Sequence, residues 1–170
     1  MTNGPGGPGV PANKPDPDGR RSAAQDLPIL NTDPGGGPTL GGPGTRRRLF
    51  EALGGRDNIE KVVDRFYDRI DGDPELRPVF PANMVVGRAR QKLFLEEWLG
   101  GEPRYSSEIG PWQLRRRHAP FQITESGAAR WIDHMEGARR DCGAPDDLAS
   151  EIASLLRPVA SRMVNTPDSE

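Results

Sequence analysis

All ten aromatic residues of this 170-residue chain lie between Phe50 and Trp131, and this uneven distribution limits where a core can form. The segment from Met1 to Thr45 holds 11 of the 21 glycines and 9 of the 18 prolines. Such a segment buries too little apolar surface to offset the entropy of ordering it, so we expect residues 1–45 to form a disordered tail. It also lacks the charged start and apolar run of a secretory signal. The remainder has the size of one domain, which we predict over residues 46–167.

The composition argues against several classes of partner. A net charge of −2 gives no general attraction to nucleic acid, although two arginine clusters, Arg46–Arg48 and Arg115–Arg117, remain to be explained. The single cysteine, Cys142, excludes an intrachain disulfide and suits a reducing compartment. No apolar run approaches the roughly 18 residues that a membrane helix needs. We therefore predict a cytoplasmic protein that binds neither membrane nor nucleic acid.

The spacing of apolar residues predicts an all-α fold, because they recur at helical intervals and no alternating run typical of a strand is present. Asp57 and Glu60 have the spacing of a capping box, and Thr124 is a typical N-cap. Pro158 should kink or loosen the last helix. The expected helices are a lead-in over 47–53, long helices over 57–70, 84–99, 125–138 and 146–164, and a short one ending at residue 118.

His118 follows the basic run Arg115–Arg117 and comes shortly before Pro120, so we expect it at the end of a short helix. Neutral imidazole is the commonest metal ligand among side chains, and a histidine at such a helix end can turn its ring toward a cleft. Most single histidines are nevertheless polar surface groups, and we interpret the other histidine, His134, as a partly exposed helix residue with no role.

Three hydrogen-bond donors fall on the expected inner faces of the helices, namely Tyr67, Gln91 and Trp131. Buried tyrosine and tryptophan usually need a partner for their O–H and N–H groups. Together with one imidazole, these donors suggest an anionic or polarised diatomic ligand held at a metal. Taken singly, Tyr67 and Trp131 are more often ordinary core residues, and Gln91 equally fits a solvent-facing position.

Residues 49–167 resemble the truncated haemoglobins, specifically group II of that family, in a long ordered series of short motifs. The series covers nearly all of the expected folded part, and its order is far more specific than any one motif. The matching motifs are Gly54-Gly55, Arg65-Phe66-Tyr67, Leu76-Arg77-Pro78-Val79-Phe80-Pro81, Phe94-Leu95-Glu96, Gly100-Gly101, Tyr105, Leu114-Arg115-Arg116-Arg117-His118-Ala119-Pro120-Phe121, Trp131 and Val164-Asn165-Thr166-Pro167.

The resemblance implies two helices packed over two others with haem b between them, and it implies a role for each matching residue. His118 would be the proximal iron ligand, and Arg117 and Tyr105 would meet the haem propionates. The haem would be lined by Phe80, Phe94, Leu95 and Phe121, and the distal ligand pocket by Tyr67, Gln91, Trp131 and Gly87.

The function that follows is reversible binding of oxygen, carbon monoxide and nitric oxide, with tight retention favoured by the distal donors. An alternative is a haem-dependent redox enzyme, a nitric oxide dioxygenase or peroxidase-like protein, which would use the same pocket and an unidentified reductase. A third hypothesis, a helical module that binds nucleic acid or an acidic partner, is disfavoured by the net charge. The sequence leaves the oligomeric state open.

Overall fold

The computed structural model describes residues 42–168, and the tail predicted over 1–45 lies outside these residues except at its end. Residues 43–45 form the first turn of helix α1 (Pro43–Ala52), so the predicted domain boundary at residue 46 falls inside a helix. Pro43 suits this place because its fixed φ matches a helical first turn and its missing N–H would be unpaired there anyway. The lead-in helix is therefore real but begins earlier than predicted.

The described residues are all-helical, which confirms the predicted fold class. Four long helices dominate: α2 (Gly55–Asp71), α3 (Val85–Trp98), α6 (Glu125–Asp141) and α7 (Asp146–Ser161). Three short ones connect them: η1 (Arg77–Val79), α4 (Arg104–Glu108) and α5 (Leu114–His118). Within residues 42–168, no helix combines the length and apolarity needed to cross a membrane.

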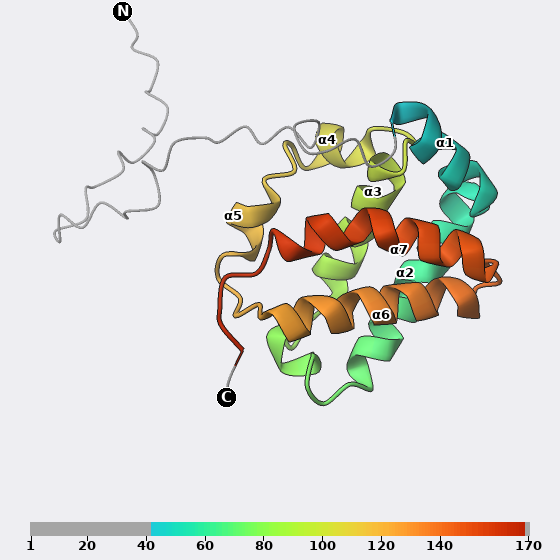
Figure 1. Cartoon of the computed structure of the whole chain (residues 1–170). Helices are drawn as coiled ribbons and strands as arrows, with labels where there is room; N and C mark the ends of the chain where they lie inside the picture. The colour runs from blue at the N-terminus through green and yellow to red at the C-terminus, as the bar shows by residue number, and fades with distance from the viewer. Residues whose placement is uncertain (1–41, 169–170) are drawn as a thin grey trace, which may run out of the picture. The chain divides into compact units, whose positions relative to one another are not determined.

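The long helices form two packed pairs. α6 and α7 lie side by side, and α2 packs against both α6 and α3 (Figure 1). The pair α2/α3 therefore faces the pair α6/α7, which is the predicted two-over-two arrangement. α5 lies beyond one end of α7, and the chain returns to that side after α7 (Figure 1).

The core forms where the apolar faces of these helices meet. α2 contributes residues three or four positions apart, so they share one side of the helix. Each buried aliphatic or aromatic side chain contributes about 1.5–3 kcal/mol relative to its exposed state. The core residues are Leu49, Ile59, Val62, Val63, Phe66, Ile70, Trp98, Leu99, Ile132, Met135, Ile152 and Leu156.

The helix boundaries follow backbone conformation more than side-chain capping. α2 begins after Gly54, whose φ of 95° favours glycine, so Asp57 lies within the first turn and the predicted Asp57–Glu60 capping box is wrong. Thr124 does cap α6, since its hydroxyl oxygen accepts the N–H of Gly127 at 3.0 Å. α7 continues through Pro158 to Ser161, so this proline does not end the helix.

Candidate functional site

A cavity of about 970 Å³ opens between α2, the α2–α3 corner, α3, α5, α6 and α7. Its volume lies at the upper end of the roughly 300–1,000 Å³ found for cofactor and small-molecule sites. The walls combine aromatic and aliphatic side chains with a few polar groups, which is the usual composition of a cofactor site. The cavity is therefore large enough for a flat organic cofactor as well as a small ligand.

The structure brings all but one of the sequence-predicted site residues to this cavity. Gly87, Gln91 and Phe94 share one face of α3 and line it. Leu95 does not: it is only 3% exposed and lies on the neighbouring face of α3, in the core with Trp98 and Leu99. The other lining residues predicted from the sequence are Tyr67, Phe80, Tyr105, Arg117, His118, Phe121 and Trp131.

His118 is the last residue of α5 and is oriented by a hydrogen bond within that helix. Its Nδ1 lies 2.7 Å from the carbonyl oxygen of Leu114. Because a carbonyl can only accept, Nδ1 must donate its proton, which leaves Nε2 with the free lone pair in a neutral ring. Histidine ligands of metals are commonly fixed by such a bond from the second ring nitrogen. His118 thus has the tautomer that a metal ligand requires.

The entry into α5 carries backbone strain. Gln113, directly before the helix, has a φ of 40° and is the one non-glycine residue with positive φ between residues 42 and 168. A non-glycine residue in this region costs on the order of 1–3 kcal/mol and persists only where its surroundings enforce it. The turn at Gln113 directs the short helix that carries His118.

Tyr67 presents a buried hydroxyl to the cavity. The residue is 4% exposed, and its ring packs edge-on against Phe66 and Phe80, at centroid distances of 5.4 and 6.1 Å. Burial raises the pKa of its phenol to about 12, so the group stays protonated at neutral pH and can donate. Within residues 42–168, its hydroxyl has no hydrogen-bond partner.

Trp131 and Gln91 repeat this pattern from two other helices. The indole of Trp131 packs edge-on against Phe66 at 5.3 Å, and Trp131 and Gln91 both line the cavity. Neither the indole N–H nor the side-chain amide has a protein partner in the part of the chain that the structure describes. Trp131 and Gln91 are half-buried, so the three donors at this cavity are free to bond to water or to a bound molecule with an acceptor atom.

Of the three arginines that line the cavity, Arg130 is paired with Asp73 and Glu75, and the other two give the cavity a cationic edge. Arg117 donates from Nε to the carbonyl of Trp112 at 3.1 Å, and its guanidinium lies 5.7 Å from the ring centre of Tyr105. Arg90 also lines the cavity and is exposed. Arg90 is not among the site residues predicted from the sequence, although its spacing from Gly87 and Phe94 on α3 places it on the same face. Both side chains suit the carboxylates of a guest molecule.

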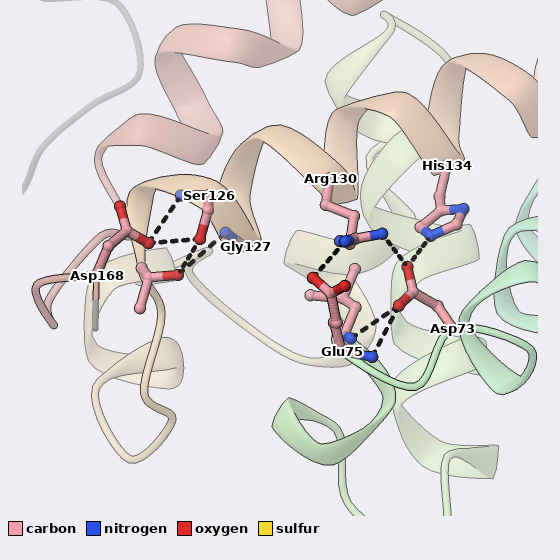
Figure 2. A network of polar contacts seen from close by, with 9 residues as sticks. Asp73, Glu75, Ser126, Gly127, Arg130, His134 and Asp168 are labelled. Atoms are coloured by element: carbon pink, nitrogen blue, oxygen red, sulfur yellow. Dashed lines mark hydrogen bonds and ion pairs between the residues drawn. The ribbon is translucent and has the colours of Figure 1, made fainter. Parts of the chain in front are cut away.

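A buried carboxylate ties the corner after α2 to α6 (Figure 2). Asp73, 5% exposed, accepts the N–H groups of Glu75 and Leu76 at 2.9 and 3.1 Å. Its second oxygen lies 2.5 Å from Nε2 of His134 and 3.3 Å from Arg130. The bond with His134, then the backbone donors and Arg130, lower the pKa of Asp73 to about 2 despite its burial. His134 is a partly exposed helix residue, as predicted, but the interpretation that it has no role is wrong, because it holds Asp73 in place.

The fold and the cavity together define a class of protein: a small helical domain in which one oriented histidine and several donors surround a space of cofactor size. Comparison with known proteins narrows the class. The model of the bacterial-like globin family matches residues 48–165. Group 2 truncated haemoglobin YjbI of Bacillus subtilis is 36% identical over 121 residues, covering 71% of this chain and 91% of that protein.

Solved structures agree. The group II truncated haemoglobin from Bacillus anthracis superposes with a TM-score of 0.68 at 40% identity, covering 71% of this chain and 93% of that one. The truncated oxygen-avid haemoglobin from Bacillus subtilis gives 0.64 at 36% identity, covering 69% and 98%. The chain belongs to the truncated haemoglobin family, group II, and membership implies a haem cofactor and haem-based binding of diatomic gases.

Proposed function

We propose that this protein holds haem b through His118 and reversibly binds oxygen and other diatomic gases on the opposite, distal side. The observation that carries the proposal is the Nδ1–Leu114 hydrogen bond, which leaves Nε2 of His118 as a ligand at the wall of a cavity of about 970 Å³. The chain has one cysteine, so it lacks the cysteine pair by which c-type haem is attached, and this supports haem b.

Each side of the cavity has residues suited to one part of the cofactor. Phe80, Phe94 and Phe121 offer apolar walls that would exclude water from the haem faces. Arg117 and Arg90 would pair with the propionate carboxylates at the cationic edge, with Tyr105 beneath the Arg117 guanidinium. When bound, haem supplies the iron at which a diatomic gas coordinates.

Tyr67, Gln91 and Trp131 would donate to the gas, with Gly87 keeping the space beside the Tyr67 hydroxyl free. A hydrogen bond to an acceptor with developing negative charge is worth roughly 1.5–3 kcal/mol, or about tenfold or more in affinity. Several such donors favour tight binding and slow release, which suits scavenging, sensing or redox chemistry better than bulk transport. The relative from Bacillus subtilis is described as oxygen-avid, which agrees with this expectation.

The test is the absorption spectrum of protein expressed with ample haem, wild type beside His118→Ala and His134→Gln. His134 is the only other histidine, and glutamine keeps a donor for Asp73. We expect a strong Soret band that shifts when carbon monoxide is added to the reduced wild type and to His134→Gln, and that is lost or greatly altered in His118→Ala. Extraction of the pigment into acidic butanone identifies non-covalently held haem b. A colourless wild type that is folded by circular dichroism and cannot take up haemin refutes the proposal.

A further inference from the structure

The segment Val164–Asp168, here called the C-terminal segment, lies against the loop Ala119–Thr124 that follows His118. The backbone N–H groups of Asn165 and Thr166 both donate to the carbonyl of Ile123, at 2.9 and 3.1 Å. Thr166 and Ile123 also line the cavity. The C-terminal segment is thus part of the wall on the side of His118.

The side chain of Asn165 uses both ends of its amide on this loop. Its Nδ2 donates to the carbonyl of Phe121 at 2.9 Å and, at 3.4 Å, to the carbonyl of His118 itself. Its Oδ1 accepts the N–H of Ile123 at 3.0 Å. If the amide were reversed, its oxygen would face the carbonyl oxygens of His118 and Phe121, and its amino group would face the N–H of Ile123. These contacts therefore define the orientation of the amide. One side chain therefore holds two backbone groups of the loop and the last carbonyl of α5.

α5 needs such an external anchor. It is a single helical turn of five residues, none of them fully buried, and Pro120 prevents it from continuing. The ring of His118 is bonded to Leu114 inside the same turn, so the ring moves with α5 as a unit. The direction of Nε2 relative to the cavity consequently depends on what holds the end of α5, and Asn165 is bonded there.

We propose that Asn165 is a positioning residue for the proximal histidine: by bonding the carbonyls of His118 and Phe121, it sets the direction from which Nε2 meets the cofactor. The inference rests on the proposed ligation of haem by His118. It assigns to the C-terminal segment a role in ligand geometry, distinct from closing the cavity wall.

Two variants separate the bonds. Asn165→Ala removes all of the side-chain contacts with the loop. Asn165→Asp keeps the acceptor for Ile123 but replaces the donor with an oxygen facing two carbonyl oxygens. Asp168→Ala is the matched control, because Asp168 ties the same C-terminal segment to Ser126 at the start of α6, whereas the contacts with His118, Phe121 and Ile123 belong to Asn165 (Figure 2).

The measurements are the iron–histidine stretching band in the resonance Raman spectrum of the reduced, haem-loaded protein and the rate of haem transfer to an excess of an acceptor apoglobin. Both Asn165 variants should shift or broaden the band and speed haem transfer on the order of tenfold, as expected when about two net hydrogen bonds are lost. Asp168→Ala should keep the wild-type band. Thermal unfolding of each apoprotein shows whether a variant is folded. If Asn165→Ala is not folded, Asn165→Asp alone provides the test.

The proposal would be overturned if both Asn165 variants kept the iron–histidine band position and the haem-transfer rate of the wild type. So would an equal change of the band in Asp168→Ala, since the effect would then come from loosening the segment as a whole. A wild-type chain that takes up no haem would instead refute the proposed function, and this inference with it.

Discussion

Replacing Tyr67 with phenylalanine should speed the release of oxygen without destabilising the fold, and the size of both effects can be estimated from the structure. The substitution removes one oxygen and keeps the ring, whose edge contacts with Phe66 and Phe80 remain at 5.4 and 6.1 Å. Between residues 42 and 168, the hydroxyl bonds to no protein group, so its loss breaks no bond within the described structure. Removing an unpaired hydroxyl that faces the cavity should leave the free energy of unfolding of the apoprotein unchanged or raise it by up to about 1 kcal/mol.

The effect on gas release should be opposite in sign and larger. If the hydroxyl donates to the gas, its removal costs roughly 1.5–3 kcal/mol of binding, which corresponds to about a tenfold to hundredfold faster dissociation. Stopped-flow displacement of oxygen by carbon monoxide from the reduced, haem-loaded protein measures this rate, and urea unfolding of the apoprotein measures stability. Tyr105→Phe is the control, because it removes a hydroxyl from the only other tyrosine, on the Arg117 side of the cavity.

Two results would refute this reasoning. An unchanged oxygen dissociation rate in Tyr67→Phe would remove Tyr67 from the ligand pocket. A loss of more than about 1.5 kcal/mol of stability would mean that the hydroxyl has an acceptor within the protein, because that is the upper range for an ordinary net hydrogen bond.

Three further predictions concern neighbouring residues. Trp131→Phe should also raise the oxygen dissociation rate, and a wild-type rate would exclude its indole N–H as a donor. Gly87→Ala places a Cβ 3.1 Å from the Tyr67 hydroxyl, and alanine favours a helix over glycine by up to about 1 kcal/mol, so the protein should stay as stable while its oxygen dissociation rate changes. This change in rate should vanish in the Tyr67→Phe background. Additive effects of the two substitutions in the double mutant would contradict the contact. Asp73→Asn keeps an oxygen for the backbone donors but loses the charge. Because folding lowers the pKa of Asp73 from 3.8 to about 2, the carboxylate stabilises the fold above pH 4, and this contribution fades as the pH falls toward 2. Urea unfolding should show the variant about 2 kcal/mol less stable at pH 7, with the difference closing between about pH 4 and 2, and a constant difference would refute the assignment.

The long helices could be predicted because their apolar residues recur on one side. On α2, every third or fourth residue from Ile59 to Ile70 returns to the buried face, so periodicity alone defines the helix. α4 was missed because it is one turn long and its sequence, Arg104–Glu108, has a single apolar-type residue, Tyr105. The start of α1 was missed because Pro43 and Gly44 look like linker residues until the helix that follows is known.

Within the site, the spacing of residues along the sequence predicts which helix carries each residue, but it does not show which face of the helix turns toward the cavity. Phe94 and Leu95 are both apolar neighbours on α3, and only the packing of α3 shows that Phe94 lines the cavity while Leu95 enters the core. The hydrogen bond between His134 and Asp73 joins residues 61 positions apart, and no local sequence pattern indicates it. The Nδ1 bond of His118 reaches only four residues back, but its existence depends on the rotamer of the ring.

The hydrogen bonds of Asn165 also set an order of events during synthesis. The amide reaches back 47 residues to the carbonyl of His118. At about 5–20 residues per second, the ribosome adds Asn165 roughly 2–9 seconds after His118, and the segment emerges later still. During that interval, His118 exists without the side chain that holds its loop. If His118 holds haem as proposed, haem that arrives earlier meets a histidine without this support, so firm binding of the cofactor should wait until the C-terminal segment has emerged.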